Sequence, residues 1–200
     1  MKKGLALRNY LSIYRINFGV LILVFLGLVI SFTFLSVDDV LDPAEIHYIG
    51  PGSQLKFQDL SDKDLSNMDL SNSDFTGANL SNTNLMNADL HNSVLTGAVL
   101  NGTNLFGANL SNAKLNGSSV TASNFARADL QNADLQGAAI QKTSFASANL
   151  SDTNMTYSSI IDSNFKDAFI SKTLFGEATV DGTKFNSVVL LLLKGAVNGK

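Results

Sequence analysis

The most regular feature of the chain is an apolar residue at every fifth position. From Leu60 to Phe185, all 26 of these positions hold Leu, Phe, Val, Ile or Met. On an α-helix, a step of five residues advances each side chain by about 140° beyond a full turn, which would spread the apolar residues over every face. On a straight strand they would alternate between the two sides. A chain that turns a corner in every repeat buries all of them, so the pattern predicts a solenoid.

A second position in the repeat accepts only small residues. Two places before each apolar residue, all 23 residues from Ser73 to Thr183 are Ala, Ser or Thr. Only a crowded interior excludes larger side chains so consistently. The earlier residues at this position are Gln58, Lys63 and Met68. We therefore expect the first coil to be a looser, atypical cap.

Residues of one kind also recur at a spacing of twenty. The recurring sets are Phe125, Phe145, Phe165 and Phe185; Ala88, Ala108, Ala128, Ala148 and Ala168; Gly77, Gly97, Gly117 and Gly137; and Asn72, Asn92, Asn112 and Asn132. Residues stacked one coil apart would sort in this way, so four repeats should make one coil of square cross-section. The four phenylalanines should then form one interior column of stacked rings.

Units such as ANLSN, ADLHN and ADLQN resemble the pentapeptide-repeat family over residues 58–187. The resemblance implies an all-β fold, a right-handed quadrilateral β-helix. The 26 repeats at four per coil make about 6.5 coils. With a strand spacing of about 4.8 Å, the rod should be roughly 31 Å long.

A separate apolar segment precedes the repeats. Residues 18–37 are twenty in number and contain no charge. As a helix they would span about 30 Å, the thickness of the hydrocarbon core of a bilayer. One alternative is a cleaved signal peptide, but its apolar stretch is usually shorter, about 7–15 residues. The other is a buried core helix, but no later segment has a helical face to pack against it. We therefore predict a transmembrane helix over residues 18–37 that places the chain in a lipid bilayer.

The basic residues around this segment predict its orientation. Residues 1–17 carry four bases and no acid, and the first base after the segment is Lys56. The four bases are Lys2, Lys3, Arg8 and Arg15. By the positive-inside rule, residues 1–17 are cytoplasmic and the repeats lie across the membrane. The repeat domain is then periplasmic, extracellular or thylakoid-lumenal.

Two flanking segments are expected to protect the ends of the rod, because solenoid ends expose strand edges. Residues 38–57 form an acidic juncture and N-terminal cap. Residues 188–200 form a C-terminal cap or tail that starts with VVLLLL, which is too short to span a membrane. This tail either folds over the last coil, with Leu190 in register, or pairs with its copy in a second chain to form a homodimer through the C-terminal end.

The residues available for chemistry are few. The chain has no Cys, no Trp and only two His, His47 and His91. Seven carboxylates sit just before central residues and point outward on different faces, so we interpret them as solvated decoration: Asp59, Asp64, Asp69, Asp74, Asp89, Asp129 and Asp134. We predict no catalytic residue, no metal site, no cofactor and no enzyme activity. The balance of 13 acids against 10 bases after residue 49 also argues against a nucleic-acid partner.

Outward apolar residues indicate contact with a partner, because the outer positions of a solenoid are normally polar. The candidates form two groups: Met86, Val94, Val99 and Phe106; and Ile161, Phe169 and Leu174. We expect a non-enzymatic interaction or scaffolding module that binds another membrane or extracytoplasmic protein. The alternative implied by the resemblance is a DNA mimic that modulates a DNA topoisomerase. The balanced charge and the predicted topology disfavour it.

Overall fold

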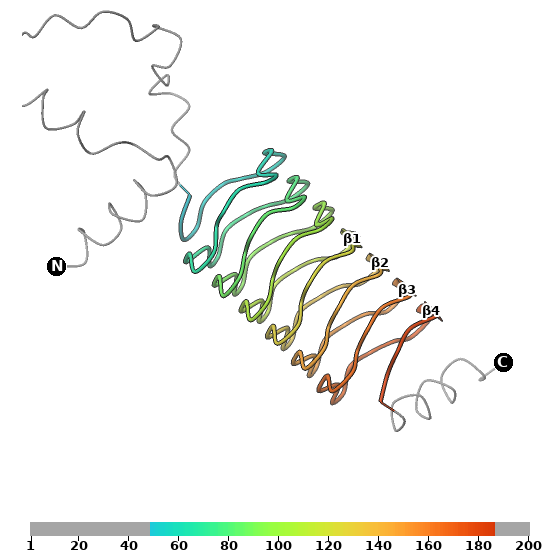
Figure 1. The fold of residues 1–200 in the computed structure, drawn as a ribbon. Coiled ribbons are helices and arrows are strands. Elements are labelled where there is room, and N and C mark those ends of the chain that lie inside the picture. The colour runs from blue at the N-terminus through green and yellow to red at the C-terminus, as the bar shows by residue number, and fades with distance from the viewer. Residues whose placement is uncertain (1–48, 187–200) are drawn as a thin grey trace, which may run out of the picture. The chain divides into compact units, whose positions relative to one another are not determined.

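The computed structural model describes residues 49–186, and these residues form a solenoid whose coils stack along one axis (Figure 1). The residue just before a central apolar residue forms a parallel bridge with the residue twenty positions later, as Asp59 does with Asn79. Four five-residue repeats therefore make one coil, as predicted. The regular coil begins before residue 58, because Leu55 is already buried and its N–H donates to the Asp74 carbonyl at 2.7 Å.

The four repeats of a coil give the solenoid four faces. We name each face by its central residues, which point inward and lie twenty apart. Face A is built on Leu60 to Val180, face B on Leu65 to Phe185, face C on Leu70 to Ile170 and face D on Leu55 to Phe175. The residues just before and just after a central residue are the outward positions of its face. The second residue after a central residue is the corner position.

The core consists of stacked columns of central residues. The phenylalanine column of face B is confirmed by ring centroids 5.0 Å apart for Phe125 and Phe145, 4.7 Å for Phe145 and Phe165, and 4.8 Å for Phe165 and Phe185. The small residues also lie inside, with Ala78, Ala98 and Ala108 fully buried. Their size lets neighbouring columns approach each other closely.

Each corner is a tight turn that reverses the sign of φ at one residue. In the turn after Phe75, the Phe75 carbonyl accepts a hydrogen bond from the Ala78 N–H at 2.9 Å, and Gly77 has a φ of 65°. A positive φ at the third residue is the requirement of a type II turn. Glycine and asparagine tolerate this conformation best, which explains their frequency at corners.

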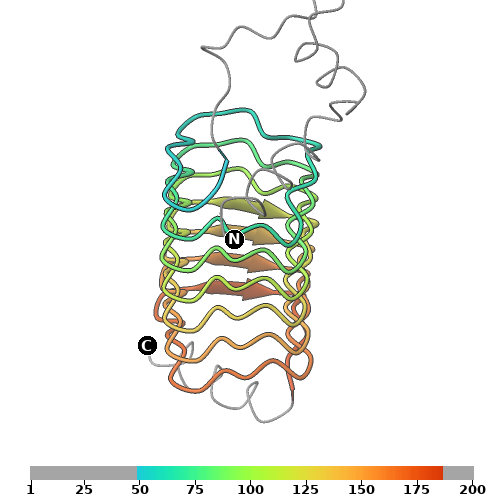
Figure 2. The same cartoon turned by 90° about the vertical axis from the view of Figure 1, so that its left-hand side faces the viewer.

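Face A carries the only named strands among the described residues. They are β1 (Ser119–Thr121), β2 (Ala139–Gln141), β3 (Ser159–Ile161) and β4 (Thr179–Asp181). They pair in parallel in the order β1-β2-β3-β4, and Figure 2 shows them stacked along one side of the rod.

Hydroxyl groups at the corner between faces A and B take over the turn hydrogen bonds beside these strands. The N–H of Thr143 donates to Ser163 Oγ at 3.2 Å, and the N–H of Ser163 donates to Thr183 Oγ1 at 3.2 Å. These corner amides are therefore paired with the next coil, which favours a longer extended segment on face A.

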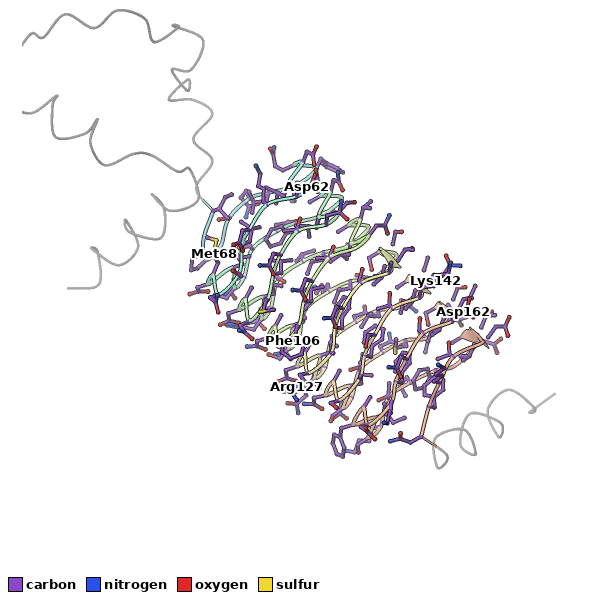
Figure 3. The ribbon with its side chains drawn as sticks, viewed as in Figure 1. Asp62, Met68, Phe106, Arg127, Lys142 and Asp162 are labelled. Atoms are coloured by element: carbon purple, nitrogen blue, oxygen red, sulfur yellow. The ribbon has the colours of Figure 1, made fainter. Side chains whose placement is uncertain are left out.

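The first coil is regular in its backbone, so the prediction of a looser coil is wrong at that level. The N–H of Gln58 donates to the Leu55 carbonyl at 3.3 Å, and the Gln58 carbonyl accepts from Asn79 at 2.9 Å. Only the side chains are atypical. Lys63 is exposed. Met68 is half-buried and lies near the N-terminal end of the described rod (Figure 3).

The last described coil differs from the coils before it in its core. Its central residues Ile170, Phe175, Val180 and Phe185 are half-buried, whereas those of the preceding coils are buried. The predicted membrane helix at 18–37, the juncture before residue 49 and the tail at 188–200 lie outside the described residues. Within residues 49–186, no helix has the length and apolar character needed to cross a membrane.

Candidate interaction surfaces

The first predicted group of outward apolar residues is divided between opposite parts of the rod. Met86 and Phe106 follow central residues of face B and lie one coil apart, beside the corner with face C. Val94 lies on face D, between Asp74 and Lys114 in its ladder, and Val99 lies on face A. The four residues therefore do not form one patch. Met86 and Phe106 remain neighbours as predicted.

Phe106 is held by a cation from the next coil. The guanidinium carbon of Arg127 lies 5.5 Å from the centroid of the Phe106 ring, and the two side chains lie along one edge of the rod in Figure 3. A contact of this geometry stabilises both side chains by about 0.5–1 kcal/mol at an exposed site. The contact therefore favours this orientation of the ring.

In the second predicted group, two members are close together. Phe169 is 63 % exposed on face C and Leu174 is 56 % exposed on face D. They lie on the two sides of one corner in the last described coil. Ile161 belongs to β3 on face A and is half-buried, so it does not join them.

The sequence reasoning missed two exposed aromatic residues. Phe57 is 77 % exposed and Tyr157 is 65 % exposed, and both occupy the corner position between faces D and A. Their φ values are 57° and 60°, a conformation that bulky side chains rarely adopt. The available signal was an aromatic residue at a position where Asn, Asp and Gly predominate. Phe57 lies against Gly77, where an added Cβ would meet its ring at 2.6 Å.

The outward carboxylates are engaged in local hydrogen bonds. Asp59 Oδ1 accepts from Ser61 Oγ at 2.7 Å, from the Ser61 N–H at 3.1 Å and from Asn79 Nδ2 at 3.0 Å. These hydrogen bonds lower the pKa of Asp59, and the bond from the Ser61 hydroxyl makes the largest contribution. Burial raises the pKa of Asp74, but hydrogen bonds from Thr76 and Lys56 outweigh it and the pKa is lowered. Both groups stay ionised and bound, which suits a structural role.

His91 forms a pair with a neighbouring carboxylate. Its Nδ1 lies 2.8 Å from Asp89 Oδ1, which also accepts from Asn109 Nδ2 at 3.0 Å. Asp69 and Asp89 share the same ladder of face C, as expected from their spacing. In residues 49–186 no group of three or more His, Asp or Glu side chains is arranged to hold a metal ion.

Asparagines form a continuous ladder along face B. Nδ2 of Asn84 donates to Asp64 Oδ1 at 3.0 Å, Nδ2 of Asn104 to Asn84 Oδ1 at 3.2 Å, and Nδ2 of Asn124 to Asn104 Oδ1 at 3.3 Å. The corner asparagines at positions 72, 92, 112 and 132, which recur at a spacing of twenty in the sequence, also lie one coil apart. There the bond from Asn92 to Asn72 at 3.3 Å shows one such contact.

A stack of coils with four repeats each, small inner residues and turns at every corner defines a quadrilateral β-helix. The chain belongs to the pentapeptide-repeat family. The family described as pentapeptide repeats (8 copies) matches residues 52–85, 83–121, 108–145, 123–157 and 135–175. None of the curated proteins resembles the sequence closely enough to count as a relative.

Several solved structures are similar to the chain. A trypsin-treated variant of QnrB1, a plasmid-mediated fluoroquinolone resistance protein, is 12 % identical, with 74 % of this chain and 86 % of that chain covered and a TM-score of 0.42. HetL, involved in heterocyst differentiation regulation in the cyanobacterium Nostoc sp. strain PCC 7120, is 17 % identical (70 % and 92 % covered, TM-score 0.28). A pentapeptide-repeat protein from the Arabidopsis thaliana thylakoid lumen is 22 % identical (72 % and 76 % covered, TM-score 0.32). Likeness at this level carries no argument about function.

Proposed function

We propose that the chain is a non-enzymatic binding module, anchored by one N-terminal membrane span, whose rod contacts another membrane or extracytoplasmic protein. The observation that carries the proposal is the exposure of Phe169 (63 %) and Leu174 (56 %) on a rod whose outer positions are mostly polar. Large apolar side chains that remain in water favour a partner, because their burial stabilises a complex by about 1.5–3 kcal/mol each.

The surroundings of these two residues suit a contact site. In the coil below, the same two ladder positions hold Asn149 and Asn154, so the two apolar residues occur side by side only in the last described coil. At the corner between the two side chains, Lys172 Nζ lies 4.0 Å from Asp152 Oδ1 and is largely exposed. Two exposed apolar side chains therefore flank one exposed cation, a combination of apolar and polar contacts that suits a protein interface.

The anchoring part of the proposal rests on the sequence. Residues 18–37 have the length and the lack of charge of a membrane span, and the four bases all precede it. The rod then lies on the extracytoplasmic side, where a flat-sided solenoid is suited to binding an extended surface.

The alternative function, a DNA mimic acting on a topoisomerase, requires a strongly acidic face. On face C the ladder reads Asp69, Asp89, Asn109, Asp129, Asn149 and Phe169, so neutral residues interrupt the acids. The binding module is therefore the better supported function.

Capture of the partner tests the proposal. The full chain, tagged at its C-terminus, is extracted in mild detergent and the co-purified proteins are measured by quantitative mass spectrometry. We expect a partner whose recovery falls at least about tenfold in a Phe169→Asp/Leu174→Asp variant.

The matched control is Gln131→Asp/Gln136→Asp, which adds the same charge at exposed positions of faces C and D. The control should recover the partner as the wild-type chain does. Equal recovery with the Phe169 and Leu174 variant would refute a binding role for these residues.

A further inference from the structure

The apolar core is open at the C-terminal end of the described rod. All four central residues of the last described coil are only half-buried: Ile170, Phe175, Val180 and Phe185. In the coil below, central residues such as Leu150 and Phe165 are buried. At the other end, Leu55 is only 1 % exposed although it belongs to the first described coil. The apolar layer at the C-terminal end therefore remains to be covered, and covering it would stabilise the rod.

The backbone at this end offers hydrogen-bond donors to one more strand. In the coil below, the N–H of Leu150 donates to the Phe169 carbonyl of the last described coil at 2.7 Å. The equivalent donors of the last described coil are the N–H groups of Ile170 and Phe175, and no further coil lies beyond them within residues 49–186. An open row of such groups is a template for strand pairing.

The sequence beyond the described residues continues the pattern of face C for one repeat. Leu190 comes five residues after Phe185 and twenty after Ile170, so it occupies the next central position of face C. The inner position of this repeat holds Val188, which is larger than the alanines of its column. The same column also begins with a larger residue, Met68, so a terminal coil accepts one there.

The five-residue pattern stops after that repeat. The next small inner position holds Leu193, and the next central position holds Gly195. A regular repeat over face D is therefore disfavoured, because leucine overpacks the inner position and glycine leaves the central position empty. Residues 191–193 are instead available to cross the end of the rod. Three extended residues span about 10 Å, which exceeds the 6.1 Å between the ring centroids of Phe175 and Phe185.

We propose that the C-terminal tail of the same chain closes the rod. Residues 188–190 add one repeat to face C, and residues 191–193 cross the open end of the core. The tail begins at the last described coil, so its covalent connection keeps it at a high effective concentration there, which favours it over a second chain. Its chemistry also matches, because residues 188–193 read VVLLLL and the surface to be covered is apolar. The inference does not depend on the proposed function.

Disulfide formation tests the position of the tail. The chain contains no cysteine, so a pair can be introduced without background. In the proposed register, residue 191 lies one coil beyond Ser171, at about 4.8 Å, which is within the Cα distances that a disulfide accepts. We expect the full-length Ser171→Cys/Leu191→Cys variant in mild detergent to form an intramolecular disulfide on mild oxidation, measured by mass spectrometry of its peptides.

The matched control is Asp181→Cys/Leu191→Cys. Asp181 is exposed in the same coil as Ser171 and also follows a central residue, but it lies on face A and is only ten residues from Leu191 along the chain. A freely moving tail would reach Asp181 at least as readily, because the loop to be closed is shorter. We expect a yield at least about tenfold lower than that of the Ser171 pair. An equal or higher yield, or disulfides mainly between two chains, would overturn the proposal.

A comparison of stability tests whether the tail covers the core. Leu190→Asp places a charge over Ile170 and should lower the urea concentration at the unfolding midpoint of the full chain by at least about 0.5 M. Val197→Asp adds the same charge beyond the proposed cover and should leave the midpoint unchanged. Equal midpoints for the two variants would contradict the cover even if the Ser171 disulfide forms.

Discussion

Replacing Phe145 with alanine removes a ring that is stacked on both sides, at 5.0 Å from Phe125 and 4.7 Å from Phe165. Phe145 is fully buried, so the space cannot fill with water at low cost. A buried Phe→Ala substitution costs about 3–5 kcal/mol. The two lost ring contacts contribute about 0.5–1.5 kcal/mol each beyond burial, so we expect the upper end of that range.

The cost is measured as the free energy of unfolding of the full chain in mild detergent, from urea titrations followed by far-ultraviolet circular dichroism. The chain has no tryptophan, so intrinsic tryptophan fluorescence is not usable. Phe145→Leu is the matched control. Leucine already occupies this column at Leu85 and Leu105 and fills most of the space, but it loses both ring contacts, so the control should cost about 1–3 kcal/mol, less than Phe145→Ala.

A second comparison uses the end of the same column. Phe185 is half-buried and stacks on Phe165 at 4.8 Å, with Phe175 edge-on at 6.1 Å. Phe185→Ala should therefore cost about half as much as Phe145→Ala, because a half-exposed ring loses less burial. If Phe145→Ala costs no more than Phe185→Ala, the closed stack of phenylalanines is not a main source of stability.

Three further predictions concern the corners, the acids and the topology. Gly107→Ala should destabilise the rod slightly more than Gly97→Ala in thermal unfolding. A Cβ at Gly107 comes within 2.6 Å of Asn87 Oδ1 and must displace the side chain that donates to Asn67, whereas Gly97 has nothing within 4 Å and a nearly equal φ. Equal losses would refute this reason. Folding lowers the pKa of Asp59, so the ionised carboxylate stabilises the folded rod above its ordinary pKa, and this stabilisation is lost as the pH falls below about 4. The free energy of unfolding of Asp59→Asn should therefore depend less on pH in that range. A pH dependence equal to that of the wild-type chain would contradict the linkage. A phosphatase that works only outside the cytoplasm should be active when it is fused after Lys200. If a reporter that works only in the cytoplasm is active at the same position instead, the orientation predicted from the four N-terminal bases is wrong.

The grouping of outward residues illustrates where reasoning from the sequence was incomplete. Val94 and Val99 lie close to Met86 along the chain, but they belong to faces D and A while Met86 belongs to face B. The twenty-residue period was sufficient to assign each of them to a face. Distance along the chain misled the grouping, because neighbours in a solenoid are residues one coil apart.

Other features of the surface depend on side-chain conformations that the sequence does not specify. The closed hydrogen bonding of Asn84 and Asn104 depends on rotamers that align each amide with the next coil. The contact of Arg127 with Phe106 depends on the direction of a long, flexible side chain. Neither follows from the identity of the residues alone.

The five-residue and twenty-residue periods by themselves determined the size of the coil, the inward residues and the phenylalanine column, because a crowded interior leaves each repeat only one arrangement. The tertiary structure decided the rest. It showed that the first coil is regular, that the last core layer is half-buried, and that Phe169 and Leu174 share a corner whereas Ile161 lies apart. Outer side chains are not confined by packing, so their contacts are set by neighbours twenty residues away and appear only when the coils are stacked.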